Sequence, residues 1–283
     1  MLKKQKPISV VVTDYRESYD LMGRICVLGL GVIGLPTALH ISKFYEVEGY
    51  DINPKAVENA NRMGLNSTCE KIPYADLYVI AVSTGINDDD TPDMSNIYDV
   101  CDQISQVNPE SLICIESTIS MGTCRQISEK FSLNKIVHCP HRFWEGDVVN
   151  YGIVQTRAFG ALNDESYRLG KIFYERQKIP VMDVSSIEIA EMCKVTENAY
   201  RFVQVAFAEE LKTICDELGL PFEELREACN TKWNIDILEA RDGIGGHCLP
   251  KDVRYLWNLL NSPLLKGAIK ADEIYKKLNR EKK

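Results

Sequence analysis

The sequence predicts an α/β fold in which a mostly parallel sheet, with helices on both faces, precedes an all-helical domain. Three observations predict it. Short apolar strands alternate with helical segments over the first two thirds of the chain. A glycine-rich turn follows the first regular strand. From Ser186, helical periodicity then runs unbroken to about Leu218, which is long enough for a helix that spans between domains or subunits.

The strands of the predicted sheet are short apolar runs bounded by polar or glycine-containing segments. They are expected at 24–28, 46–50, 77–82, 112–115, 135–139, 153–160 and 178–184, after a candidate edge strand at 8–13. Helices are expected at 33–43, 54–62, 165–175 and 186–218, and residues 221–283 are expected to be mostly helical. Serines before the long helix can cap it, and Gly219 and Pro221 end it. The chain therefore divides into an extension (1–23), a sheet domain (24–184) and a helical domain (185–283).

The composition is that of a globular protein, with 45% hydrophobic and 26% charged residues among 283. The formal net charge of −8 argues against general binding to nucleic acid or to an anionic membrane. Ten cysteines without a CxxC pair predict reduced thiols and a cytoplasmic location. The apolar run 8–12 is too short for a membrane span or a secretion signal. No metal site is expected.

The turn after the first regular strand contains a dinucleotide-binding motif. Gly29, Gly31 and Gly34 space it as GxGxxG, with Val32 and Ile33 between the last two glycines. Such glycines allow a tight turn and the close approach of a pyrophosphate to a helix N-terminus. Asp51 ends the second strand about twenty residues later, where an acid binds ribose hydroxyls and repels a 2′-phosphate. The sequence thus predicts the Rossmann-type, doubly wound form of the sheet and NAD as its cofactor.

Two further patterns indicate reactive chemistry in the helical domain. Cys248 lies in a glycine-lined segment, with Asp252 four residues on, and a thiolate there would act as a covalent nucleophile. Lys194 and Asn198 are four residues apart on the long helix and therefore share one face. Together an ammonium and an amide can hold a substrate oxygen that becomes negative during reaction.

In combination, these segments resemble the UDP-glucose/GDP-mannose dehydrogenase family. The resemblance covers roughly residues 24–270 and is most similar to the UDP-N-acetylmannosamine dehydrogenase branch. It rests on an ordered set of motifs: GLGVIGLP, AVSTGINDDDTPDMSNI, ESTISMGT, CPHRFWEGD, EIAEMCKVTENAYRFVQVAFAEEL and GIGGHCLPKD. The family oxidises the C6 alcohol of a nucleotide sugar, of the UDP-N-acetylmannosamine or UDP-glucose type, to a carboxylate with two NAD per turnover.

The resemblance also implies a role for each matching residue. Cys248 would trap the aldehyde as a thiohemiacetal, which is oxidised to a thioester and then hydrolysed. Lys194, Asn198 and Asp252 would stabilise oxyanions and position water, Thr118 would lie beside the nicotinamide, and Glu145 would lie between cofactor and substrate. The other implied cofactor residues are Val82, Ser83, Thr84 and Ser117, and the other implied substrate residues are Arg142, Phe143, Trp144, Gly243 and Gly245. A homodimer through the long helix is also implied.

Two departures from the family pattern stand out. The family's Pro-Glu dyad, whose glutamate is assigned to thioester hydrolysis, reads Pro140-His141 here. His141 could serve as the base near neutral pH or could only fill the rim of the pocket. The sequence also stops where the family continues into a nucleotide-binding domain. A separate nucleotide-binding subunit, a smaller substrate and a loss of turnover are the three explanations.

Two other functions compete with a nucleotide-sugar dehydrogenase. A β-hydroxyacid dehydrogenase has this length, a Rossmann domain followed by helices, and a lysine and an asparagine on the long helix, but it needs no cysteine. A non-catalytic NAD-binding or subunit-assembly protein would fit His141 and the shorter chain.

Overall fold

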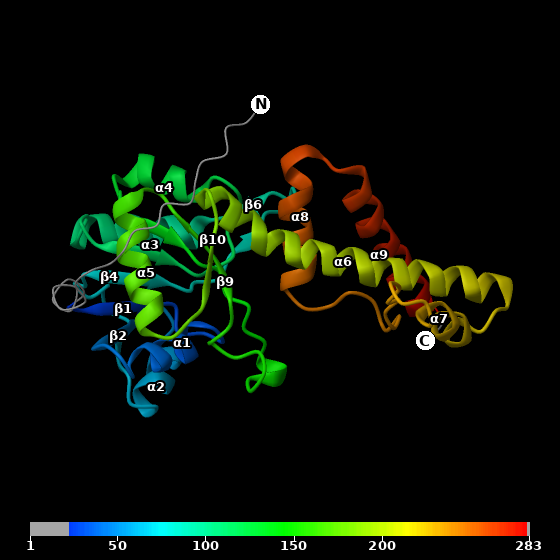
Figure 1. The fold of residues 1–283 in the computed structure, drawn as a ribbon, viewed down its shortest axis with the longest axis horizontal. Coiled ribbons are helices and arrows are strands. Elements are labelled where there is room, and N and C mark those ends of the chain that lie inside the picture. Colours follow the sequence, from blue (N-terminus) through cyan, green and yellow to red (C-terminus); the bar gives the residue numbers. More distant parts are fainter. Residues whose placement is uncertain (1–22, 282–283) are drawn as a thin grey trace.

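A computed structural model describes residues 23–281, which form a sheet with its covering helices at one end and a group of helices at the other (Figure 1). The expected edge strand at 8–13 lies outside these residues. The main sheet has eight strands in the order β10-β9-β8-β7-β4-β1-β2-β3. Neighbouring strands are parallel except for β8 and β9, which are antiparallel. The prediction of a mostly parallel sheet is therefore confirmed.

Seven strands of the main sheet agree in position with the predicted runs, to within a few residues. The sheet strands are β1 (Ile25–Leu28), β2 (Val47–Tyr50), β3 (Asn66–Thr68), β4 (Leu77–Ile80), β7 (Leu112–Ile115), β8 (Ile136–His138), β9 (Arg157–Ala161) and β10 (Val181–Asp183). The first part of the run expected at 153–160 is not a strand, because β9 begins only at Arg157. The sequence did not predict β3 or the hairpin of β5 (Gly85–Ile86) and β6 (Pro92–Asp93).

Helices cover both faces of the sheet, as the doubly wound form requires. One face packs against α1 (Gly34–Ile41), α2 (Pro54–Arg62) and α5 (Asp164–Arg176) through a core that includes Val27, Ala38 and Phe173. The opposite face packs against α3 (Ser95–Val107) and α4 (Thr123–Phe131) through residues such as Ile80 and Ile104. Because successive strand residues point to opposite faces, a run of four apolar residues supplies both cores.

The helical part is built along α6 (Ile187–Leu218), which leaves the sheet and contacts α7 (Phe222–Asn230), α8 (Cys248–Leu260) and α9 (Pro263–Glu281) (Figure 1). Gly219 adopts a left-handed conformation with φ of +67° at the end of α6. The predicted spanning helix is therefore confirmed. Within residues 23–281, no helix is long and apolar enough to cross a membrane.

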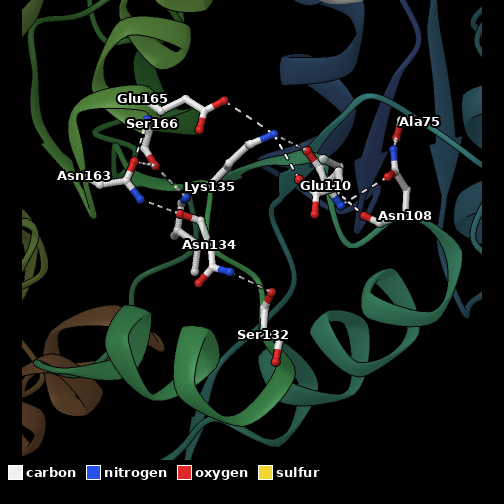
Figure 2. A network of polar contacts seen from close by, with 11 residues as sticks. Ala75, Asn108, Glu110, Ser132, Asn134, Lys135, Asn163, Glu165 and Ser166 are labelled. Carbon is white, nitrogen blue, oxygen red and sulfur yellow. Dashed lines mark hydrogen bonds and ion pairs between the residues drawn. The ribbon is translucent and has the colours of Figure 1, made fainter.

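Polar contacts fix the edge of the sheet at which the parallel strands begin (Figure 2). Asn163 caps α5 by accepting the Ser166 N–H at 2.9 Å, and its Nδ2 donates to the Asn134 carbonyl at 2.7 Å. Lys135 Nζ lies 3.3 Å from a Glu110 carboxylate oxygen and 3.5 Å from one of Glu165. In open parallel sheets, ligands bind at the opposite edge, where the strands end.

Candidate active site

The residues expected to bind a cofactor lie in the turns that follow β1, β2, β4 and β7. The carboxyl ends of parallel strands share one edge, so these turns line one crevice of the sheet. The expected set comprises Gly29, Gly31, Val32, Ile33, Gly34, Asp51, Val82, Ser83, Thr84, Ser117 and Thr118.

Glycine is favoured at the three positions of the first turn for different structural reasons. Gly29 has a φ of +88°, and a Cβ there would lie 2.8 Å from the Ala81 carbonyl oxygen. At Gly34 a Cβ would lie 1.7 Å from the Gly29 carbonyl oxygen, so only glycine permits this closeness of strand and helix. A Cβ at Gly31 would meet nothing within 4 Å among the described residues. Gly31 therefore leaves open space at the N-terminus of α1, as a pyrophosphate would need.

Asp51 is held against the same turn by its carboxylate. Its Oδ2 accepts the Leu30 N–H at 2.6 Å, and its Oδ1 accepts the Asn53 N–H at 2.8 Å. The side chain is only partly buried. An oriented acid beside an open glycine turn fits the ribose and pyrophosphate of a dinucleotide.

Hydroxyl groups join the turns after β4 and β7. Ser117 Oγ donates to the Val82 carbonyl at 2.6 Å, and Thr84 Oγ1 donates to the Thr118 carbonyl at 2.8 Å. Tyr255 on α8 donates from its hydroxyl to the Gly85 carbonyl at 2.6 Å. Through Tyr255, the helix that begins at Cys248 is attached to the crevice wall.

The predicted reactive residues of α6 and α8 meet through one hydrogen bond. Asn198 Nδ2 donates to Asp252 Oδ2 at 2.5 Å. Cys248 is the exposed first residue of α8, one helical turn before Asp252 and on the same face. Lys194 lies one turn before Asn198 on α6, and within residues 23–281 its ammonium has no hydrogen bond or ion pair. The thiol, the carboxylate, the amide and the ammonium therefore line adjoining faces of two packed helices.

Lys251 is a member of this site that the residue-by-residue prediction left out. It is 4% exposed and Asp252 is 1% exposed, and Lys251 Nζ contacts Asp252 Oδ1 at 2.5 Å. The ammonium also lies over the Tyr255 ring, 4.1 Å from its centroid. The signal was present in the motif, where Lys251 stands three residues after Cys248 and directly before Asp252.

The loop before Cys248 is held by α9. Asp272 Oδ1 accepts the Ile244 N–H at 2.8 Å, and Lys276 Nζ donates to the Ile244 carbonyl at 2.7 Å. Gly243 has a φ of +98°, and a Cβ there would lie 2.4 Å from the Lys276 side chain. Gly243 is thus required by its packing against α9, whereas a Cβ at the exposed Gly245 would meet nothing within 4 Å in the described chain.

A hollow of about 460 Å³ adjoins this loop. Gly243, Gly245 and Leu249 line it together with Arg201 and Arg226. Arg201 is exposed and continues the face of α6 that carries Lys194 and Asn198. Sequence reasoning missed Arg201, although its spacing of seven residues from Lys194 could have found it.

His141 is buried in a polar cluster rather than on the rim of a pocket. The side chain is 6% exposed, and its Nε2 contacts the carboxylate of Glu116, which follows β7. Arg157, which is 0% exposed, lies 3.2 Å from the same carboxylate, and the Tyr174 hydroxyl donates to it at 2.9 Å. Burial raises the pKa of Glu116, but the neighbouring His141 and Arg157 outweigh it and lower that pKa to about 2. The interpretation of His141 as a rim residue is therefore wrong.

The segment after His141 first contacts α6 and then enters a short exposed helix. Arg142 is engaged by α6, with its Nε donating to Glu197 Oε1 at 2.9 Å, and Phe143 is partly buried. Trp144 is 57% exposed, and its ring packs on that of Tyr151 at a tilt of 53°. Glu145 is exposed in the short helix η2 (Glu145–Asp147) and, in the part of the chain that the structure describes, makes no polar contact with another expected site residue.

Comparisons with known proteins agree with this arrangement. Residues 61–178 match the NAD binding domain model, and residues 188–272 the central domain model, of the UDP-glucose/GDP-mannose dehydrogenase family. An NDP-N-acetyl-D-galactosaminuronic acid dehydrogenase of Ralstonia nicotianae is 34% identical over 266 residues, which are 81% of this chain and 63% of that protein. A UDP-N-acetyl-D-mannosamine dehydrogenase of Methanocaldococcus jannaschii is 31% identical over 263 residues, or 83% and 62% of the two chains.

A solved structure of a similar protein also superposes on this chain. The UDP-D-ManNAc dehydrogenase of Pyrococcus horikoshii superposes with a TM-score of 0.78 at 28% identity, covering 89% of this chain and 68% of that one. The chain thus spans slightly less than two thirds of the length of the two sequence relatives.

Proposed function

Since this chain belongs to the UDP-glucose/GDP-mannose dehydrogenase family, we propose that it takes part in the NAD-dependent oxidation of a nucleotide sugar at C6. The substrate class would be a UDP-N-acetylhexosamine or UDP-glucose, and the product its uronic acid. Relatives named for N-acetylhexosamine derivatives favour the first of these.

The observation that carries the proposal is the hydrogen bond between Asn198 and Asp252. It joins the face of α6 that includes Lys194 to the face of α8 that begins at Cys248. Since residues four apart on a helix are neighbours, four polar or nucleophilic groups from two helices converge there. Tyr255 attaches the same helix to Gly85 at the start of β5, which directly follows the turn after β4 where the nicotinamide end of the cofactor would lie.

Each of these groups would have its own role in the oxidation. NAD, when bound, accepts the hydride in each of two oxidations. Lys194 and Asn198 would stabilise the oxygen of C6 as it becomes negative. The Cys248 sulfur would attack the aldehyde carbon to form a thiohemiacetal, and loss of a second hydride would leave a thioester. In this way no reactive aldehyde is released between the two steps.

Hydrolysis would complete the reaction. The oxygen of a water would form a bond to the thioester carbon as its proton moves to a base, for which we propose His141. The carbon–sulfur bond would then break, and the Cys248 thiolate would leave with the electron pair. Arg142 is committed to Glu197 and Glu145 to an exposed segment, so we propose no catalytic step for Arg142 and only contact with a bound substrate for Glu145.

A homodimer is part of the proposal. Large side chains on α6 are exposed in a stripe with a spacing of seven or four residues: Tyr200, Phe207, Ile214 and Leu218. At 3.6 residues per turn this stripe lies on the side of α6 opposite to Lys194 and Asn198. Pairing of two α6 helices would therefore bury the stripe without closing the site.

Anchorage of the nucleotide is proposed to need more than the residues described. Arg201 and the hollow beside Gly243 could receive an anionic group, but the relatives are longer than this chain. We propose that a further nucleotide-binding unit, such as a separate subunit, completes the site.

The test is spectrophotometric detection of NADH. The protein, alone and with any nucleotide-binding partner encoded beside it, would be incubated with NAD and UDP-N-acetylmannosamine, UDP-N-acetylgalactosamine, UDP-glucose or a small β-hydroxyacid. NADH from a nucleotide sugar is the expected result. NADH from the hydroxyacid alone would indicate a β-hydroxyacid dehydrogenase, and calorimetric binding of NAD without any oxidation would indicate a non-catalytic NAD-binding protein.

A further inference from the structure

The buried cluster around His141 contains a histidine with one ring nitrogen engaged and one without a partner. Nε2 contacts the Glu116 carboxylate and lies 3.0 Å from Thr37 Oγ1 on α1. Nδ1 is buried and has no hydrogen-bond partner among the residues described. A buried polar atom without a partner calls for an explanation, and a site for a water or a substrate atom is one.

Both neighbours of Nε2 require a proton on that nitrogen. Glu116 offers only acceptor oxygens when ionised, and its surroundings favour the ionised form: the Tyr174 hydroxyl donates to one oxygen and the Arg157 guanidinium lies 3.2 Å from the other. Thr37 has one hydroxyl hydrogen, which its Oγ1 donates to the Ile33 carbonyl at 2.9 Å. The Thr37 oxygen is therefore an acceptor toward His141.

Arg157 is the one contact that would favour an unprotonated Nε2. Its Nη1 makes a hydrogen-bond contact of 3.5 Å with Nε2, which is longer than the 3.0 Å contact between Nε2 and the Thr37 oxygen. Nη1 also lies 3.2 Å from the Glu116 carboxylate as an ion pair, without a hydrogen bond to it. Arg157 also acts on the charge of the ring. Desolvation first, and then the charges of Arg157 and Lys194, lower the pKa of His141, while Glu116 raises it. The lowered pKa favours the neutral ring.

We propose that Glu116, assisted by Thr37, is a positioning residue that holds His141 in the neutral tautomer with the proton on Nε2, so that Nδ1 is the basic atom. The inference rests on the proposed function for its catalytic consequence, although the tautomer itself can be tested without activity. It gives the histidine what a general base needs, an oriented ring with a free lone pair. The next residue in the chain, Arg142, donates to Glu197 on α6 at 2.9 Å, which places this part of the chain against the helix that carries Lys194 and Asn198.

Nuclear magnetic resonance tests the tautomer directly. The chain has four histidines, so selective 15N labelling gives few signals, and His141→Gln identifies the one of interest. At pH 6.5, where an ordinary imidazole is half protonated, His141 is expected to be neutral, with a protonated Nε2 and an unprotonated Nδ1. His40, whose Nε2 lies 3.0 Å from the Gln177 carbonyl oxygen, is an internal reference for that tautomer. A proton on Nδ1 in the wild-type protein would overturn the inference.

Glu116→Gln tests the positioning role. It keeps the shape of the side chain but removes the ionised acceptor, and the matched control is Glu110→Gln at the opposite edge of the sheet (Figure 2). Glu116→Gln is expected to give a mixture of tautomers and the control the wild-type spectrum. An unchanged tautomer in Glu116→Gln would contradict the positioning role. The wild-type measurement remains decisive if Glu116→Gln does not fold.

Kinetics separate this inference from the proposed function. In enzyme that turns over, Glu116→Gln is expected to slow release of the sugar from its thioester by about 10- to 100-fold, a fraction of what general base catalysis contributes. Because Glu116 raises the pKa of His141, the rising limb of the pH profile for that step is expected to move to lower pH. If the tautomer is as proposed but thioester release is unchanged, His141 is not the base. If the tautomer is wrong, the inference fails whatever the enzyme oxidises.

Discussion

Asn198 on α6 donates a hydrogen bond of 2.5 Å to Asp252 on α8, and Asp252 also binds the buried ammonium of Lys251. Asp252 is therefore shared between the two helices. One of its oxygens sets the position of the amide on α6, and the other neutralises a lysine in the core of the site. The site can be built only if α6 and α8 are packed correctly, which couples its chemistry to the stability of the helical part.

Asp252→Ala is expected to destabilise the protein. It leaves the Lys251 ammonium, 4% exposed, without its carboxylate, and breaking a buried ion pair costs about 3 to 5 kcal/mol. Urea unfolding followed by circular dichroism measures the change. The matched variant is Lys251→Met with Asp252→Ala, which removes both charges and is expected to be more stable than Asp252→Ala alone. Equal loss in the single and double variants would contradict a buried pair.

Asp51→Ala is expected to weaken NAD binding by roughly 10- to 100-fold. A hydrogen bond to a charged group contributes about 1.5 to 3 kcal/mol, and its loss implies a change of this size. The carboxylate that is oriented by Leu30 and Asn53 would no longer bind ribose hydroxyls or repel a 2′-phosphate. Calorimetry with NAD and with NADP gives both affinities, and the preference for NAD should shrink. Glu58→Gln, at an exposed site on α2, is the control. Undiminished NAD affinity in Asp51→Ala would contradict the assignment of this crevice.

Glu209 is expected to make stability depend on pH. Its carboxyl on α6 is fully buried near Asp272, and burial, followed by the Asp272 charge, raises the pKa of Glu209 to about 7. The folded state favours the protonated carboxyl, and this preference stabilises the fold. The stabilisation is fully present below pH ~4.5, the pKa of Glu209 in the unfolded chain, and is lost as pH rises through about 7.

Glu209→Gln removes that titration. Between pH 5 and 8 the free energy of unfolding of the wild-type protein is expected to fall by roughly 2 to 3 kcal/mol more than that of Glu209→Gln, as the size of the pKa shift implies. Urea unfolding at the two pH values measures the difference, with Glu210→Gln at the adjacent exposed position as the control. Parallel pH curves for wild type and Glu209→Gln would show that the carboxyl is ionised throughout.

Phe207→Glu is expected to convert a dimer into a monomer of 32.1 kDa. Phe207 is 54% exposed at the middle of the stripe on α6, and two charges facing each other across paired helices would be repelled and desolvated. Light scattering with size-exclusion chromatography reports the mass. Glu224→Lys on α7, outside the stripe, should leave it unchanged. A wild-type mass of 32.1 kDa would remove the dimer from the proposal.

Local patterns predicted those parts of the fold that local chemistry determines. Gly29 and Gly34 were identifiable because their backbone geometry admits no side chain, and Asp51 because an acid at that spacing has a known use. Cys248 and Asp252, and likewise Lys194 and Asn198, share faces because of helical periodicity alone. By contrast, β3 and the β5–β6 hairpin have only two or three residues each and leave too short a pattern to detect.

Contacts across the fold could not be predicted in the same way. His141 meets Glu116 and Arg157 because β7, β8 and β9 are neighbours in the sheet, an order that the sequence does not state. The role of α9 in holding Ile244 likewise depends on how two helices pack. Glu145 was expected between cofactor and substrate by resemblance, which stays a prediction: in this structure Glu145 is exposed in the short helix η2.

Covalent catalysis by Cys248 is tested most directly by intact-mass spectrometry of protein quenched in acid during turnover with NAD and UDP-N-acetylmannosamine. Wild-type protein should carry the mass of one oxidised nucleotide sugar, located on the peptide that contains Cys248. Cys69→Ala, a control at another exposed thiol, should carry the same mass on the same peptide. Cys248→Ala should carry none and should form no uronic acid. Uronic acid formation at the wild-type rate by Cys248→Ala would contradict the thioester mechanism.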